Sequence, residues 1–234
     1  MKIALCILNK NEAECLKIML PMLPKPGPES GVDMIVAIDG NSTDGSPEML
    51  KAHGIPVVGQ SALGRGQAFH TAFDKVDVDA WIFFSPDGNE DVKDLPRFRQ
   101  HLEAGADLVI ASRMMKGAFN EEDIHFLRPR KWANNAFNWL ANTFFGRGRV
   151  PYVTDSINGY RAITKQAAKK LKLDAPDYTI EYQMTMRALM HGLKIAEFPT
   201  YEGQRFAGEP GAPSIPTGIR FDRRSFRELL ARVI

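Results

Sequence analysis

The first half of the chain alternates short apolar runs with segments whose apolar residues recur at helical spacing. The apolar runs predict strands at residues 2–8, 33–39, 55–59, 80–85 and 107–112. The segments between them predict helices at residues 12–22, 46–53, 66–75 and 94–104. Such alternation is typical of a mostly parallel sheet with helices on both faces, so we expect a single α/β domain.

The second half has a different pattern. It predicts an amphipathic helix over residues 128–145, a helix at 178–191, a strand at 194–199, a Gly- and Pro-rich loop at 207–218 and a basic amphipathic helix at 219–234. In the first of these helices the apolar residues at helical spacing are Trp132, Ala136, Phe137, Leu140 and Phe144, and a separate polar stripe consists of Asn134, Asn138 and Asn142. In the last helix one side carries Phe226, Leu229, Leu230 and Val233, with Arg223, Arg224 and Arg227 elsewhere.

Composition sets limits on the class of protein. A chain of 234 residues with 44% hydrophobic and 25% charged residues suits one large globular domain, and a net charge of +2 does not indicate a nucleic-acid partner. Cys6 and Cys15 show neither metal-ligand spacing nor a disulfide framework, which favours a reducing compartment. Residues 1–8 resemble a first strand and not a signal peptide, and no apolar run is long enough to span a bilayer. We expect a cytoplasmic protein, with attachment to the cytoplasmic face of the membrane left open.

Polar and acidic residues follow two of the predicted strands. Asp39 ends the strand at 33–39, and Asp87 and Asn89 follow the strand at 80–85. Open α/β sheets bind nucleotides at the carboxyl ends of their strands, and a divalent cation that bridges a diphosphate takes one or two protein oxygens. These positions predict one site for a nucleotide and Mg²⁺ or Mn²⁺, although Asp39 alone also suits a structural role in its turn.

Two arginines lie where they would meet a diphosphate. Arg65 stands between Gly64 and Gly66 at the start of a predicted helix, and Arg113 follows the fifth predicted strand. A tight turn with a solvated arginine is the alternative for residues 64–66. The five histidines show no metal-binding spacing, and the GxSxG signature of a serine hydrolase is absent from the sequence.

Several segments, taken in order, resemble family 2 glycosyltransferases, and the later ones resemble polyprenyl-phosphate sugar synthases of the dolichol-phosphate mannose synthase type. The segments are 7–14, the Asp39 turn, 64–66, 85–89, 155–162, 178–181, 192–199, 204–205 and 208–209. The similarity runs from about residue 3 to residue 228, which is nearly the whole chain. It implies a GT-A type fold that binds a nucleotide diphosphate sugar, with a nucleotide-binding half at 1–115, an acceptor half at 116–218 and the helix at 219–234 added to them.

The resemblance also implies roles for individual residues. The nucleotide-sugar site would consist of Leu8, Lys10, Glu12, Asp39, Arg65, Ser85, Pro86, Asp87, Arg113 and Glu181. The catalytic set would be Asp87, Arg113, Asp155, Arg161 and Arg205, and the metal ligands would be Asp87 and Asn89. Ser85 stands where the family has the first metal carboxylate, and Gly208-Glu209-Pro210-Gly211 lacks the lysine of the family's Gly-Glu-Ser-Lys motif.

These features predict an inverting transferase that moves a sugar from a GDP- or UDP-sugar to a polyprenyl phosphate, an acceptor that needs no strong base. The first alternative is a soluble transferase with a small hydroxyl acceptor and Asp155 or Glu181 as base. A nucleotidyltransferase and a non-catalytic nucleotide-sugar-binding subunit are the second and third. A buried Asp155–Arg161 pair would instead be structural. The helices at 128–145 and 219–234 either meet a membrane surface or pack on the sheet. The sequence leaves open whether the protein also binds a separate membrane subunit or forms a homo-oligomer.

Overall fold

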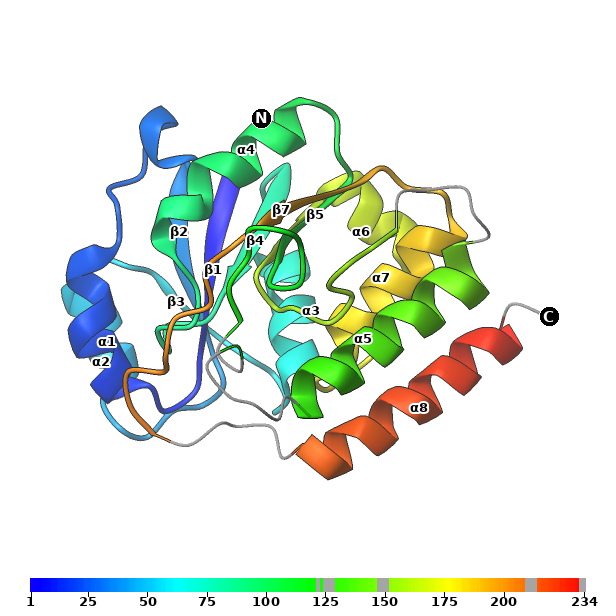
Figure 1. Ribbon diagram of the computed structural model, residues 1–234. Coiled ribbons are helices and arrows are strands. Elements are labelled where there is room, and N and C mark those ends of the chain that lie inside the picture. Colours follow the sequence, from blue (N-terminus) through cyan, green and yellow to red (C-terminus); the bar gives the residue numbers. More distant parts are fainter. Residues whose placement is uncertain (121–122, 124–128, 147–151, 209–213, 232–234) are drawn as a thin grey trace.

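A computed structural model describes residues 1–120, 123, 129–146, 152–208 and 214–231. At its centre lies a seven-stranded sheet in the order β3-β2-β1-β4-β6-β5-β7, with helices on both faces (Figure 1). The strands are β1 (Ile3–Asn9), β2 (Met34–Asp39), β3 (Val57–Gly59), β4 (Ala80–Phe84), β5 (Leu108–Ser112), β6 (Arg161–Thr164) and β7 (Ile195–Pro199). Every pairing is parallel except those of β6, which runs antiparallel to β4 and β5. The predicted α/β domain with a mostly parallel sheet is confirmed.

The helices follow the predicted order. They are α1 (Ala13–Met19), α2 (Ser46–Ala52), α3 (Arg65–Lys75), α4 (Leu95–Glu103), α5 (Pro129–Ala141), α6 (Lys165–Leu171), α7 (Ile180–Met190) and α8 (Ser214–Ala231). Short 3₁₀ turns occupy Leu20–Met22, Pro28–Ser30 and Val92–Asp94, and α5 continues as a π-helical turn over Asn142–Gly146. The helix predicted at 12–22 therefore divides into α1 and a 3₁₀ turn, and Arg128 lies outside the described residues.

Two elements depart from the sequence prediction. β6 and α6 occupy a stretch for which no element was predicted, because four residues that begin with a buried Arg161 do not form an apolar run. The predicted loop at 207–218 is wrong in its second part, since α8 begins at Ser214. The boundary expected at residue 218 consequently falls inside α8.

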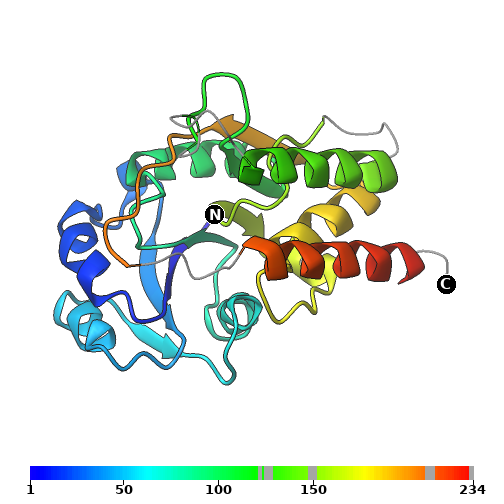
Figure 2. The same ribbon diagram turned by 60° about the horizontal axis from the view of Figure 1, so that its bottom comes forward.

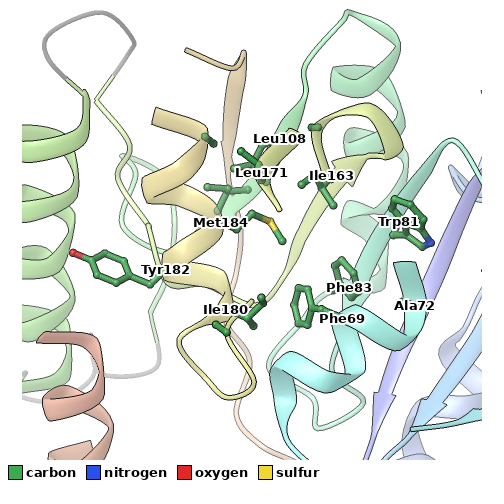
Figure 3. Close-up of a cluster of buried hydrophobic side chains, with 14 of the residues drawn as sticks. Phe69, Ala72, Trp81, Phe83, Leu108, Ile163, Leu171, Ile180, Tyr182 and Met184 are labelled. Atoms are coloured by element: carbon green, nitrogen blue, oxygen red, sulfur yellow. The ribbon is translucent and has the colours of Figure 1, made fainter. Parts of the chain in front are cut away.

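Side chains of successive strand residues build an apolar core on each face of the sheet. On one face Phe83 of β4 stacks on Phe69 of α3, with ring centroids 3.7 Å apart, and α6 and α7 complete the cluster (Figure 3). On the other face Phe84 meets Tyr160, which packs on Phe98 of α4 with centroids 4.8 Å apart. The two clusters hold the strand ends in fixed register, and the polar side chains at those ends form the candidate site.

Candidate functional site

The carboxyl ends of β1 and β2 lie side by side and carry a buried polar pair. Asn9, the last residue of β1, is in register with Asp39, the last residue of β2. The Asn9 Nδ2 donates to Asp39 Oδ1 at 2.7 Å and to Ser46 Oγ at 2.9 Å, and the Ser42 amide donates to Asp39 Oδ2 at 3.0 Å. These bonds fix the orientation of the carboxylate. Sequence reasoning missed Asn9, whose signal is its place at the end of the strand next to Asp39.

The other residues of the first turn lie around this pair. Lys10 is exposed and its Nζ donates to the Asn41 carbonyl at 2.8 Å, whereas Leu8 is half-buried against the core beneath. Glu12, expected beside Asp39, has both carboxylate oxygens bound by one Arg205 nitrogen, at 2.6 and 2.8 Å. Glu12 therefore lies between the turn that follows Asp39 and Arg205, which is far away in the sequence.

Arg205 joins Glu12 to the acidic turn after β4. Its second terminal nitrogen donates to Asp87 Oδ2 at 2.9 Å. Around it, the Phe206 amide donates to the Asp87 carbonyl at 2.7 Å and the Gly203 amide to the Asn89 carbonyl at 3.1 Å. The segment 203–206 is therefore attached along the acidic turn by its main chain, with one arginine shared by two carboxylates.

Gly88 is required by this attachment. It has a φ of +99°, and a Cβ added there would lie 2.8 Å from the Phe206 ring. A side chain at position 88 would therefore strain the turn and displace the segment that carries Arg205.

Oxygen atoms of the acidic turn suit a divalent cation. Asn89 Oδ1 is buried and has no hydrogen-bond partner among the residues that the structure describes, which is costly unless a ligand satisfies it. Glu90, which sequence reasoning missed, accepts from the Ser85 amide at 2.7 Å. Burial, and after it the charge of Asp87, raise the pKa of Glu90 well above its usual range. Within the described residues no group of three His, Cys, Asp or Glu side chains could hold a metal ion.

Arg65 and Glu181 form a second cluster beside this turn. Arg65 Nε donates to Glu181 Oε1, and Arg65 Nη1 lies 3.4 Å from Ser85 Oγ. Burial opposes the charge of Arg65, but Glu181 raises the pKa of the guanidinium above its ordinary value. The structure thus brings together three predicted site residues from α3, α7 and the end of β4.

The glycines around Arg65 have a packing explanation. A Cβ at Gly64 or Gly66 would collide with the carbonyl groups of Pro176 and Ala175. Close approach of α3 to residues 175–176 therefore requires these glycines, whether or not the turn also meets a phosphate.

Arg113 forms the third cluster with two buried carboxylates. Its Nε and Nη2 donate to Asp155 at 2.8 and 3.0 Å, and its Nη1 donates to Glu202 at 2.9 Å. Burial alone would lower the pKa of Arg113, but the two carboxylates raise it well above its ordinary value. Sequence reasoning missed Glu202.

Arg161 lies below the site and does not form the ion pair with Asp155 that the sequence left open. It is fully buried and donates to the carbonyl oxygens of Asn158, Ser156 and Glu181. Burial lowers the pKa of Arg161 to about 10. Its hydrogen bonds hold β6 against α7, so its contacts are those of a supporting residue. Pro86, another predicted site residue, is buried within the acidic turn.

The three clusters meet at one place. Ser85 links the first two, because its amide donates to Glu90 at 2.7 Å and its Oγ lies 3.4 Å from Arg65 Nη1, and the charge of Arg113 in the third cluster also lowers the pKa of Glu90. Carboxylates, arginines and an unpartnered amide oxygen thus converge at the carboxyl ends of the parallel strands, the part of an open α/β sheet that receives ligands.

Comparison with known proteins agrees with this arrangement. A family model described as glycosyl transferase family 2 matches residues 5–171, which is well over half of the chain. The chain belongs to this family, which confirms the resemblance noted in the sequence, and the glycosyltransferases among its relatives support the expected enzyme class.

Individual relatives are more distant. Glycosyltransferase AglJ of Haloferax volcanii is 29% identical over 203 residues, covering 84% of this chain and 62% of the relative. Polyprenol monophosphomannose synthase of Mycolicibacterium smegmatis is 27% identical over 154 residues, covering 63% of this chain and 56% of the relative. The chain thus spans less than two thirds of the length of each of these two relatives.

The fold also matches solved structures. Glucosyl-3-phosphoglycerate synthase of Mycobacterium tuberculosis, in complex with Mn²⁺, UDP and glucosyl-3-phosphoglycerate, superposes with a TM-score of 0.67 at 21% identity, covering 99% of this chain and 79% of the other. The expected GT-A-like fold is thereby confirmed. Among the described residues, none of the helices combines the length and the apolar character that a membrane crossing requires.

Proposed function

We propose that this protein is an inverting, metal-dependent transferase that moves a sugar from a nucleotide diphosphate sugar to a polyprenyl phosphate at the cytoplasmic face of a membrane. The observation that carries the proposal is the state of the carboxylates in the acceptor half. Asp155 is bound by Arg113, and Glu181 is bound by Arg65. Neither is free to act as a base, and an acceptor that is already an anion needs none.

The donor would lie at the ends of β1, β2 and β4. Asp39, held in place by Asn9, would accept a hydrogen bond from the nucleoside, with Leu8 and Lys10 close to the base. Arg65 and Arg113 would face the diphosphate. The polar edge of an open sheet is the general place for such a ligand, and the solved relative was captured with UDP.

Asp87 and Asn89 would hold Mg²⁺ or Mn²⁺, with Glu90 as an additional ligand in place of the carboxylate missing at Ser85. The unpartnered Asn89 Oδ1 supports this assignment. A bound cation would neutralise charge on the leaving diphosphate. Arg205 occupies one Asp87 oxygen, so it would have to share or release Asp87 when the donor binds.

The chain's own groups would then position the reactants. Arg113 and Arg65 would stabilise the diphosphate as its bond to the sugar breaks, while the acceptor phosphate attacks the opposite face of the sugar. Arg205 would supply positive charge near the acceptor. Asp155 and Arg161 would hold these arginines and the base of the pocket in position.

A second candidate is a soluble transferase with a small hydroxyl acceptor. Glu90 favours it, because this carboxylate has a raised pKa and, within the described residues, accepts its one hydrogen bond from the Ser85 amide. The fold relative whose structure contains glucosyl-3-phosphoglycerate also has a small, soluble ligand.

Product analysis separates the two candidates. The protein is incubated with labelled GDP- and UDP-sugars and Mg²⁺ or Mn²⁺, and is given either a polyprenyl phosphate in detergent or 3-phosphoglycerate in buffer. Label that moves into the organic phase only when polyprenyl phosphate is present supports the proposal. Label in a water-soluble product, with none in lipid, would favour the second candidate. Full transfer in excess chelator would refute the metal dependence.

A further inference from the structure

Helices α5 and α8 lie next to each other on one side of the molecule (Figure 1, Figure 2). They touch through Phe137 and Phe221, whose ring centroids are 5.1 Å apart. Both helices are amphipathic in sequence, and such helices ordinarily turn their apolar face to the protein. Here the two helices place much of their polar side against the body.

On α5 the inward side is the asparagine stripe. Asn138 is 1% exposed; its Nδ2 donates to the Thr154 carbonyl, and its Oδ1 accepts from Ser156 N and Oγ at 2.7 and 2.6 Å. Asn142 bonds both the amide and the carbonyl of Val153, at 2.8 and 2.9 Å. These amides bind the main chain of residues 153–156, so the orientation of α5 is fixed by hydrogen bonds.

On α8 the inward side is ionic around one glutamate. Glu228 is 1% exposed and accepts from Arg187 at 2.8 and 3.0 Å and from Gln183 at 2.6 Å. Arg224 is also buried, and its Nη1 lies 3.5 Å from Asp174. Breaking a buried network of this kind is costly, so α8 is held with this face toward α7.

The orientation leaves large apolar side chains on the outside. On α5 and the turn that continues it they are Trp132, Trp139 and Phe144, and on α8 they are Phe226 and Leu230, with exposed fractions from 42% to 69%. Trp139 and Phe144 also meet each other, with ring centroids 6.2 Å apart. A surface that gathers such side chains on two adjacent helices marks an interaction site, whereas apolar residues scattered singly do not. These five residues are here termed the α5/α8 face.

Arginines accompany the α5/α8 face, of which Arg227 and Arg220 also lie 2.6 and 3.8 Å from Asp174 and Asp177. The described side chains of α8 that are exposed are Arg220, Arg223, Phe226, Arg227 and Leu230, so each is either an arginine or apolar. Aromatic and aliphatic residues beside arginines suit the headgroup region of an anionic bilayer. A second copy fits less well, because a two-fold interface would bring two copies of the same arginine-bearing surface together and their like charges would repel.

We infer that the α5/α8 face binds the surface of an anionic lipid bilayer. The inference rests on the proposed function only for the role of this binding, which would bring the enzyme to an acceptor in the membrane. The binding itself needs neither acceptor nor donor. It is an interfacial attachment by two helices that the rest of the fold holds in place.

Vesicle flotation without any acceptor tests the inference. The wild type is mixed with vesicles of phosphatidylcholine and phosphatidylglycerol, or of phosphatidylcholine alone. We expect flotation with the anionic vesicles, weaker as salt rises, because salt screens the arginines. A wild type that stays at the bottom with anionic vesicles at low salt overturns the inference.

Two matched variants locate the surface. Replacing Trp132, Trp139, Phe226 and Leu230 with serine should reduce vesicle binding by about tenfold or more, because each apolar side chain buried in the interface adds to the affinity. The control replaces Ile18 and Met22, which are exposed to a similar degree in and just after α1, with serine and should float like wild type. Equal flotation of the fourfold variant, with melting temperature and nucleotide affinity unchanged in both proteins, would refute the assignment.

Light scattering and a transfer assay distinguish lipid binding from self-association and from the proposed reaction. A wild-type dimer together with a monomeric fourfold variant would make the α5/α8 face a self-interface and overturn the lipid assignment. Transfer to polyprenyl phosphate in detergent is measured separately. Flotation without transfer would contradict the proposed function and leave the lipid assignment intact, whereas transfer without flotation would do the reverse.

Discussion

The two halves of the site, proposed to bind the donor and the acceptor, hold their carboxylates in different ways. At the ends of β1 and β2, Asp39 is held by neutral donors, the Asn9 amide and a main-chain N–H. In residues 116–218, the buried carboxylates of Asp155 and Glu202 share the half-buried Arg113, and the buried carboxylate of Glu181 binds the half-buried Arg65. A carboxylate held by neutral donors keeps its charge for a ligand, whereas a buried ion pair is already satisfied. Under the proposed function, the end of β2 therefore presents a carboxylate to the nucleoside, whereas the carboxylates of residues 116–218 are already paired with Arg65 and Arg113 and support those arginines.

Asp87 stands at the boundary between these two arrangements, and its removal should have the largest effect. Asp87→Ala removes a proposed metal ligand and should reduce transfer by about a thousandfold, because metal stabilisation of the leaving group supplies several kcal/mol. The measurement is transfer rate in saturating Mn²⁺, together with binding of Mn²⁺ followed by paramagnetic relaxation. Asp91→Ala is the control, since Asp91 caps a 3₁₀ turn nearby. Similar loss in both variants would assign the effect to the loop's structure.

Removing the cation from the ion pairs of Arg113 with Asp155 and Glu202 should lower the stability of the fold. Arg113→Met leaves Asp155 buried without its cation and removes one partner of Glu202, and we expect a loss of about 3–5 kcal/mol in the free energy of unfolding. Denaturant unfolding measures it. Lys17→Met, which breaks the exposed pair with Glu14, should cost less than about 1 kcal/mol. If both variants unfold at the same denaturant concentration, the contrast between the two halves is wrong.

At the proposed donor site, a substitution should change ligand affinity instead of stability. Asp39→Ala should weaken binding of a free nucleoside diphosphate by about 1.5–3 kcal/mol, the loss of a charge-assisted hydrogen bond. Calorimetry on wild type and variant measures the difference. Asn9→Ala should weaken binding in the same direction but less, because Asn9 positions Asp39. Unchanged affinity of Asp39→Ala for the nucleoside diphosphate would show that this carboxylate has a structural role in its turn and does not bind the nucleotide.

Glu90 offers the smallest and most specific test, through pH. Its raised pKa means that the folded protein holds a proton that the unfolded chain releases near pH 4.5. Wild-type stability relative to Glu90→Gln should therefore fall as pH rises above 4.5 and stop falling once the folded state has also lost the proton. Melting temperatures of both proteins across this range measure the difference. A constant difference would show that Glu90 ionises normally.

The strand ends of the donor half were predictable because their signals are local. Asp39 and Asp87 follow apolar runs, and parallel strands bring their carboxyl ends to one edge. Glu90 follows Ser85 closely in the same turn, but nothing in the sequence shows that its carboxylate bends back to the Ser85 amide. β6 was missed because it is short and begins with a buried arginine, which interrupts the apolar pattern.

The sequence by itself determined the α/β order, the polar strand ends and the amphipathic character of α5 and α8. Periodicity, however, shows only that a helix has two faces. Which face meets the body was decided by Asn138 and Glu228, whose hydrogen bonds and ion pairs turned apolar residues outward. Tertiary structure also decided which charges pair: Arg205 reaches Asp87 and Glu12 across 118 and 193 residues, and Asp155 binds Arg113 and not Arg161. Such pairings depend on how separate elements pack in space, which no local pattern records.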